Sequence, residues 1–258
     1  MPIDRNLWAE WFAELPRWQC PKCEHGYLRP LSDTVEKRET GESEREHDDP
    51  DWELQWVRQR FVGLMKCDSE SCGEIVSVGG DIWGEEMEHE THGSVWVEGY
   101  QVRWVYPPVV PFRTRQFPSA VTENIRRAAG LMWYDPEAAA NKLRQAVELL
   151  LTNQGIRRTV ITKKKRRVPL PLHDRVVEYG KRGATQKERA DYMLAVKWIG
   201  NVGSHVGQVT RSHVLDGFDM MNVVLDDNFL GTRAELQRRA AEINRRRTPA
   251  GPRRRRNK

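Results

Sequence analysis

The spacing of hydrophobic and polar positions changes near the middle of the chain, which predicts two different kinds of structure. Before the proline-rich segment 106–111, aromatic and branched residues are concentrated in runs at 52–65, 75–78 and 95–106. Runs of this kind are typical of strands. The acidic residues 85–90 are expected to form a loop between two of the strands. We therefore predict a small β domain.

Two segments of this first half carry different patterns. Residues 3–15 place large apolar side chains at helical spacing, which predicts a short amphipathic helix ended by Pro16. Residues 32–51 are polar and acidic and are expected to form a solvated loop.

After the prolines, apolar residues recur every three or four positions, which predicts helices. The first expected helix covers 119–133 and is capped by Ser119, and the second starts at Asp135–Pro136 and stops at Gly155. The next two are a helix at 170–180 and one that opens with the capping box Thr185–Glu188. The last two are a helix at 210–229 and a terminal basic helix that opens with the capping box Thr232–Glu235. A basic loop is expected at 157–167. The predicted fold class is α+β, with a β domain at 1–110, a helical bundle at 111–231, and a basic helix with a flexible Arg-rich tail at 232–258.

Charge is distributed unevenly between the two halves. Residues up to Phe112 contain 11 Lys and Arg against 23 Asp and Glu, or −12, whereas the residues from Arg113 onward contain 31 against 14, or +17. The basic half suits an anionic partner, and nucleic acid is the commonest one. No apolar run approaches the length of a membrane span, and the N-terminus lacks a secretion-signal pattern, so a cytoplasmic location without a membrane partner is expected.

The four cysteines form two pairs. Cys20 and Cys23 have two residues between them, and Cys67 and Cys72 have four. Pairs of this kind beside strands are typical of a zinc ribbon, in which four thiolates bind a structural Zn²⁺ and leave no open position for catalysis. Disulfides or free thiols are the alternative, which a cytoplasmic chain disfavours.

Three histidines near this region are further candidate ligands. His25 lies two residues after Cys23 and is a less favoured substitute for one thiolate. His89 and His92 lie in the acidic segment and are expected to be solvated.

A stretch at 197–207 of the helical half combines polar and small residues. Lys197, Asn201 and His205 lie four residues apart and share one helical face. Gly200, Gly203, Ser204 and Gly207 are small, which indicates close approach of another helix or a local break. A capping or packing role for His205 without any chemistry remains the alternative.

The helical half resembles a known family. Residues 117–119, the run 136–151 with Arg144 and Glu148, and the Gly-Asn-x3-His signature at 200–205 together resemble the bacterial family of domains of unknown function numbered 4145. Members often carry a cysteine-paired ribbon upstream. That family looks related to the HEPN superfamily, whose all-helical domains commonly dimerise and include metal-independent ribonucleases of defence and restriction systems.

The catalytic motif of HEPN ribonucleases is only partly matched by this sequence. His205 matches their histidine and Asn201 matches a polar residue within their motif, but the positions of their arginine are occupied by Trp198, Ile199 and Gly200. Cleavage through a ribose 2′-hydroxyl needs a base, for which His205 would serve, and a cation near the phosphate. Arg144 is the candidate cation, although an ion pair with Glu148 one turn away is expected.

Two basic runs of the helical half are candidate phosphate contacts. The predicted nucleic-acid-binding residues are Arg157, Arg158, Lys163, Lys164, Lys165, Arg166 and Arg167 in the first run, and Arg253, Arg254, Arg255 and Arg256 in the tail. A solvated face with a disordered tail is the alternative. Few aromatic residues accompany these runs, so base stacking on them is not expected.

The sequence therefore predicts a zinc ribbon joined to a HEPN-like bundle that binds RNA or DNA in a prokaryotic defence or restriction-type system. It is expected to be non-catalytic or weakly catalytic and to form a homodimer through its helices. One alternative is a metal-independent endoribonuclease that uses His205. The other is an adaptor whose acidic ribbon half docks a protein partner in a defence complex.

Overall fold

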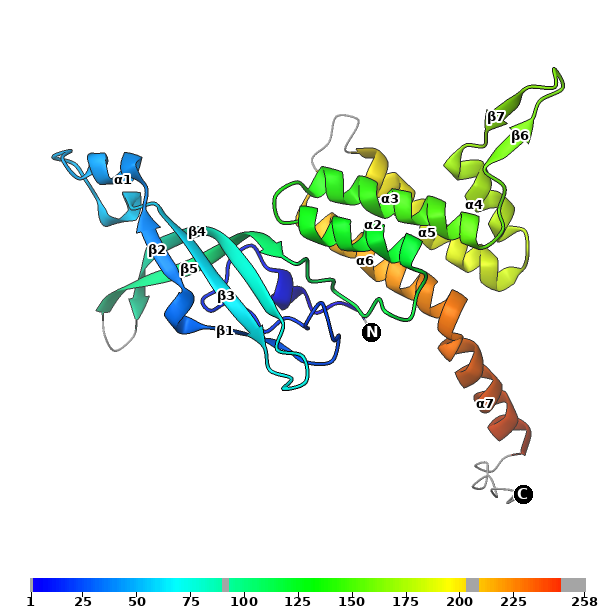
Figure 1. Cartoon of the computed structure of the whole chain (residues 1–258), viewed down its shortest axis with the longest axis horizontal. Helices are drawn as coiled ribbons and strands as arrows, with labels where there is room; N and C mark the ends of the chain where they lie inside the picture. Colours follow the sequence, from blue (N-terminus) through cyan, green and yellow to red (C-terminus); the bar gives the residue numbers. More distant parts are fainter. Residues whose placement is uncertain (1, 90–92, 203–208, 247–258) are drawn as a thin grey trace.

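The protein has a strand-rich part followed along the chain by a helical part (Figure 1). This computed structural model describes residues 2–89, 93–202 and 209–246. The mixed α+β class is therefore confirmed. None of the described helices has both the length and the hydropathy required to cross a lipid bilayer.

The strand-rich part is built on an antiparallel sheet. Strands β3 (Gln59–Cys67), β4 (Ile75–His89) and β5 (Gly93–Tyr106) follow one another as neighbours, and β1 (Leu28–Pro30) and β2 (Glu36–Glu39) both pair with the free edge of β3. Consecutive strands can pair in this way because short connections suffice for antiparallel neighbours.

The two faces of this sheet differ in burial. Along β3 the side chains of Phe61 and Met65 are buried, whereas those of Arg60 and Lys66 are exposed. Because successive side chains of a strand point to opposite faces, one face of the sheet packs on the core and the other is solvated.

The prediction of an acidic loop at 85–90 is wrong for the residues of this segment that the structure describes. Strand β4 continues to His89, and its register pairs Glu85 with Val97 and Glu86 with Trp96. The glutamates are tolerated because the side chains of Glu85 and Glu86 are exposed. The side chain of His89 and all of His92 lie outside the description.

The helix predicted at 3–15 is also wrong. Only a 3-10 turn, η1 (Arg5–Trp8), forms there, and Phe12 instead exchanges two backbone hydrogen bonds with Tyr100 of β5, at 3.0 and 2.7 Å. Trp8, Phe12 and Leu15 are nevertheless buried, because the extended segment lies against the core, whereas Trp11 is exposed.

The solvated loop predicted at 32–51 contains regular structure. It includes β2 and a short helix, α1 (Gly41–Glu46), with 3-10 turns at Ser32–Thr34 and, just beyond it, Leu54–Trp56. Ser43 is buried; its hydroxyl donates to Glu39 at 2.7 Å and accepts from the Arg58 amide at 3.0 Å. Side-chain hydrogen bonds thus stabilise a segment that has few apolar residues.

The helical part contains most of the predicted helices. They are α2 (Ser119–Leu131), α3 (Pro136–Asn153), α4 (Leu172–Gly180), α5 (Ala184–Val202), α6 (Arg211–Leu225), a π-helical turn at Asp226–Leu230, and α7 (Thr232–Arg246). Helix α3 lies beside α2, α5 and α6, so its buried residues, such as Leu143 and Val147, form the centre of the helical core.

The predicted caps have mixed outcomes. The carboxylate of Asp135 accepts from the Ala138 amide at 2.9 Å, which confirms the start of α3. Ser119 and Thr185, in contrast, lie inside the first turns of α2 and α5 and are not N-caps. Thr210 caps α6 and forms a capping box with His213.

The basic loop predicted at 157–167 is instead largely a β-hairpin. Strands β6 (Thr159–Ile161) and β7 (Arg167–Pro169) pair antiparallel and project from the helical part (Figure 1). Its turn places Lys165 at φ 54, and the Lys165 amide donates to the carbonyl of Thr162 at 2.9 Å.

A cluster of tryptophans joins the two parts. The rings of Trp8 and Trp18 each lie 5.5 Å from that of Trp133 at the end of α2, measured between centroids, and all three side chains are buried. The N-terminal segment also reaches α6, where Arg5 contacts Asp216 at 2.8 Å and Asp219 at 2.6 Å. The buried residues consequently form one continuous core.

Replacing Trp133 should reveal how much this junction contributes to stability. Trp133→Ala is expected to lower the free energy of unfolding by about 3–5 kcal/mol, because a large buried side chain leaves a cavity. Trp133→Phe should lose less, since the Trp133 indole N–H is buried without a partner in the described structure. Denaturant-induced unfolding measures both changes, and the exposed Trp198 serves as the control in Trp198→Ala. Equal stability of Trp133→Ala and Trp198→Ala would contradict this role.

Candidate functional site

The four cysteines lie in two turns at one end of the sheet. Cys20 and Cys23 belong to a turn just before β1, in which the Cys20 amide donates to the carbonyl of Gly26 at 2.8 Å. Cys67 is the last residue of β3, and Cys72 follows in the connection to β4. Because β1 pairs with β3, the two turns are brought together, with Leu28 opposite Cys67.

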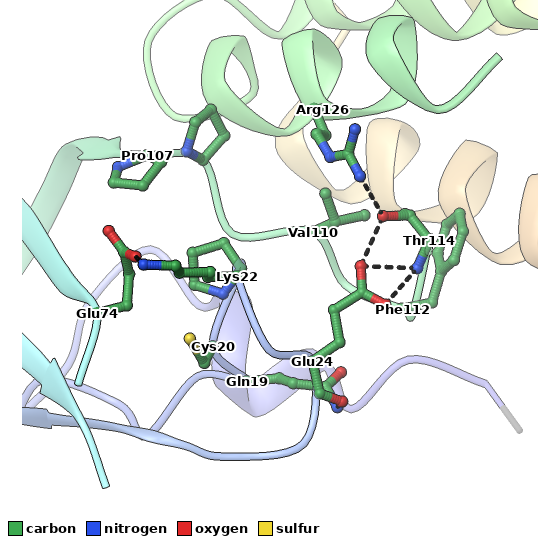
Figure 2. Close-up of a pocket in the computed structure, with 12 residues that line it drawn as sticks. Gln19, Cys20, Lys22, Glu24, Glu74, Pro107, Val110, Phe112, Thr114 and Arg126 are labelled. Atoms are coloured by element: carbon green, nitrogen blue, oxygen red, sulfur yellow. Dashed lines mark hydrogen bonds and ion pairs between the residues drawn. The ribbon is translucent and has the colours of Figure 1, made fainter. Parts of the chain in front are cut away.

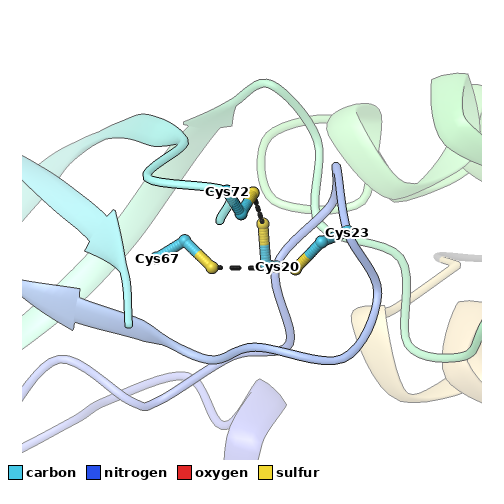
Figure 3. A group of neighbouring side chains, drawn as sticks. All are labelled: Cys20, Cys23, Cys67 and Cys72. Atoms are coloured by element: carbon cyan, nitrogen blue, oxygen red, sulfur yellow. Dashed lines mark hydrogen bonds between the residues drawn. The ribbon is translucent and has the colours of Figure 1, made fainter. Parts of the chain in front are cut away.

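The four thiols form one compact group (Figure 3). All four Sγ atoms lie within 4.8 Å of one another; Cys20 and Cys72 are 3.8 Å apart, and Cys23 and Cys67 are 3.7 Å apart. The cysteines predicted as ligands therefore form a cluster that can hold a metal ion.

The protonation of these thiols is set by their surroundings. Burial raises the pKa of Cys20 and raises that of Cys67 to about 12. Burial also opposes ionisation of Cys23, but the amides of His25 and Gly26 lower its pKa to about 6. Since the thiolate is the form that binds a metal, these two amides favour the ligand form of Cys23.

His25 has another role than the substitute ligand considered from the sequence. Its Nδ1 lies 2.8 Å from the carbonyl oxygen of Cys23, and the side chain is exposed. Among the described residues, the ligand group at this position consists of the four thiols.

The first cysteine turn is also connected to the helical part (Figure 2). Glu24, which adopts φ 57, accepts hydrogen bonds from the Thr114 amide at 3.0 Å, the Thr114 hydroxyl at 2.7 Å and the Arg115 amide at 3.1 Å. Arg126 of α2 donates to the same Thr114 hydroxyl at 3.2 Å. The turn that carries two metal ligands thus contacts the segment leading into α2, a role that the sequence did not indicate.

The polar stripe of the helical half borders a separate cavity. A pocket of about 520 Å³ lies between α3 and α5 and brings Asn141, Arg144, Gly200 and Asn201 together. A Cβ at Gly200 would lie 2.9 Å from the carbonyl oxygen of Ala140, so close approach of α3 explains this small residue. His205, together with Gly203, Ser204 and Gly207, lies outside the described residues.

Arg144 is held within its own helix. It donates to Asn141 at 3.2 Å and forms the predicted ion pair with Glu148 at 3.2 Å. The guanidinium nevertheless lines the pocket with Asn201, so the structure brings together two of the three residues predicted for catalysis.

The first basic run is exposed over its whole length. Lys163, Lys164, Lys165, Arg166 and Arg167 lie at the turn of the β6–β7 hairpin and form no ion pair with any described residue. Arg158 is exposed, and Arg157 contacts Glu178 at 3.3 Å. The predicted tail residues Arg253, Arg254, Arg255 and Arg256 lie outside the described part of the chain.

Gly26 provides a test of the cysteine cluster. A Cβ at this position would lie 2.6 Å from the Cys67 Sγ, so Gly26→Ala is expected to displace that thiol. The affinity of the site for the metal should fall by at least about tenfold. Element analysis of the purified protein and competition with a chelator measure the loss. Gly41→Ala is the matched control, because its Cβ has ordinary contacts only. Normal metal content in Gly26→Ala would contradict the four-thiol site.

In comparisons with known proteins, different family models match the two parts of the chain. A search of curated proteins and a search of solved structures found no match. Two family models match: a domain of unknown function, DUF8608, over residues 12–107, and a domain of unknown function, DUF4145, over residues 126–246. The resemblance to family 4145 predicted from the helical residues is thereby confirmed for residues 126–246. The match of the strand-rich part to DUF8608 was not predicted.

Proposed function

We propose that the protein binds nucleic acid through the β6–β7 hairpin, as a non-catalytic or weakly catalytic component of a prokaryotic defence or restriction-type system. The observation that carries this proposal is the run of five exposed cations, Lys163–Arg167, at the tip of a projecting hairpin. Cations without protein partners are available to phosphates, whose neutralisation releases counterions and supplies most of the affinity for nucleic acid.

The shape of the hairpin supports this function. A two-stranded ribbon fits the major groove of duplex DNA, which is about 12 Å wide. Contacts with phosphates carry no sequence information, so we expect binding with little sequence preference. HEPN-like character of the helical half, which rests on the resemblance, agrees with a nucleic-acid partner.

We further propose that the bound metal is a structural Zn²⁺ and that the strand-rich half is a zinc ribbon. A tetrahedral zinc with Zn–S bonds of about 2.3 Å has sulfur–sulfur edges of about 3.8 Å. The distances of 3.7 and 3.8 Å between the thiols fit that geometry. Four thiolates fill the coordination sphere, so the zinc would stabilise the two turns and leave no open position for a substrate.

Removing charge from the hairpin tests the nucleic-acid proposal. The triple variant Lys163→Ala, Lys164→Ala, Lys165→Ala is expected to bind a short DNA or RNA duplex at least about tenfold more weakly at moderate salt. The slope of log affinity against log salt concentration should become shallower by about 1–3, because fewer counterions are released. Fluorescence anisotropy over a salt series with full-length protein measures both quantities.

A matched variant separates the hairpin from overall charge. Arg113→Ala, Lys181→Ala, Lys187→Ala removes three exposed cations elsewhere in the helical half and changes the net charge equally. This control should retain nearly the original affinity and salt slope. Equal losses in the two triple variants would assign binding to net charge and refute the hairpin site.

A second candidate function is a metal-independent endoribonuclease. The observation that favours it is the pocket of about 520 Å³ in which Arg144 and Asn201 meet beside α5. In this reading His205 removes the proton of a ribose 2′-hydroxyl, and Arg144 stabilises the negative charge that develops on the phosphate. The ion pair between Arg144 and Glu148 weakens this candidate, because it already occupies part of the guanidinium.

Cleavage assays separate the second candidate from simple binding. If the protein is a ribonuclease, it should cleave RNA in EDTA, and His205→Ala should reduce the rate by at least about a hundredfold, since a positioned base contributes about 10²–10⁴-fold. His173→Ala is the control, because that histidine is exposed on α4. RNA cleavage that persists in His205→Ala, or no cleavage by any form, would exclude this mechanism.

A further inference from the structure

A groove lies where the solvated face of the sheet approaches the end of α2. It has a volume of about 600 Å³, and its exposed walls are formed by Arg60 of β3, Asp81 of β4, Arg103 and Trp104 of β5, and Tyr134. We call these five residues the aromatic groove. None of the sequence motifs pointed to it, because its residues come from distant segments of the chain.

Aromatic rings are unusually accessible here. Tyr134 is 83% exposed and Trp104 is 41% exposed, and Tyr106, two residues further along β5, is 70% exposed. Trp104 and Tyr106 follow each other on the same side of β5, about 6.7 Å apart along the strand. Large apolar side chains gathered on a surface indicate a binding site, and flat rings favour flat ligands.

The charged residues that line the groove carry a net positive charge. Asp81 pairs with the Nε atoms of both Arg60, at 3.1 Å, and Arg103, at 2.7 Å. One carboxylate therefore neutralises only one of two guanidiniums. The terminal amino groups of both arginines take no part in these two contacts, and they are donors suited to a phosphate.

Among the described residues that line the groove, only Asp81 is acidic. Eight acidic residues of this half, from Glu36 to Asp51, lie in β2, in α1 and in the segment that follows α1, and Glu85 and Glu86 lie further along the hairpin of β4 and β5. A duplex offers no free base faces for stacking. An unpaired strand needs only a narrow positive channel and stacking surfaces.

We propose that the aromatic groove binds single-stranded nucleic acid, with bases stacked on Tyr134 and Trp104 and phosphates contacted by Arg60 and Arg103. Stacking is tolerant of sequence because every base has a π-face. This site extends the proposed function from phosphates at the hairpin to unpaired bases, and it does not depend on the hairpin. A protein exposing both sites engages paired and unpaired regions of one nucleic acid.

The test uses full-length protein and two fluorescein-labelled probes, oligothymidylate and oligouridylate, in anisotropy titrations at low salt. Tyr134→Ala should weaken binding of at least one probe by about fivefold or more, the equivalent of about 1 kcal/mol, which is the low end of the stacking contribution of one base. Tyr134→Phe should bind like the original protein, since it retains the ring. The two probes also show whether DNA or RNA is preferred.

Two further variants keep the result interpretable. Arg103→Ala should weaken binding and reduce its salt dependence. Tyr27→Ala, which removes an exposed tyrosine of the strand-rich part, should leave the affinity unchanged. Trp104 is avoided because its ring covers the backbone at Gly79 and its removal risks the sheet. Unchanged affinity in both Tyr134→Ala and Arg103→Ala overturns the proposal and leaves the groove to a protein partner.

The two nucleic-acid sites can fail separately. The hairpin triple variant should lose duplex affinity and retain the sensitivity of single-strand binding to Tyr134→Ala. If Tyr134→Ala instead weakens duplex and single-strand binding equally, no separate stacking site exists and the inference is refuted. If the hairpin variant has normal duplex affinity while Tyr134→Ala loses single-strand affinity, the hairpin proposal fails and the groove stands.

Discussion

The packing of Trp8 and Trp18 against Trp133 is the contact on which the arrangement of the molecule depends. Two of these rings come from the N-terminal 18 residues and the third from the end of α2, so the sheet and the helices share one core. Arg211 reinforces this junction, because its guanidinium lies 4.6 Å from the centre of the Trp133 ring and donates to the carbonyl of Ala9 at 2.7 Å. The two parts of the chain that the family models match are therefore joined by buried contacts as well as by the chain itself.

The features predicted correctly from the sequence are those that depend on a few neighbouring residues. The start of α3 followed from Asp135 and Pro136, and the cysteine cluster that can hold a metal followed from two cysteine pairs, because a cap or a cysteine turn needs only neighbouring residues. The first 15 residues were predicted wrongly because large apolar side chains at helical spacing also suit an extended segment pressed on a core. The β6–β7 hairpin was missed because Lys165 takes the positive φ usually left to glycine or asparagine.

Long-range contacts account for most of what the sequence did not reveal about the sites. Glu24 binds Thr114 across 90 residues, and Trp104 and Tyr134 meet in a groove only because the junction brings α2 to the sheet. Asn201 was predicted from the family motif and Arg144 as a substitute for the arginine that the motif lacks here, and both line one pocket. The pattern gave no information on the strength of the Arg144–Glu148 pair, which decides how much of that cation a phosphate can use.

The metal cluster has a consequence beyond its own turns. Its first turn carries Glu24, whose carboxylate accepts from Thr114 and Arg115, and Arg126 extends this contact to α2. The aromatic groove lies between the same sheet and the C-terminal end of the same helix. A metal ion held by the four thiols would fix the first turn, and through Glu24 and Arg126 it would also restrain α2 against the sheet. A closed four-thiol site suits this purpose, because a restraint is useful only if it does not exchange ligands with the solvent or with a substrate.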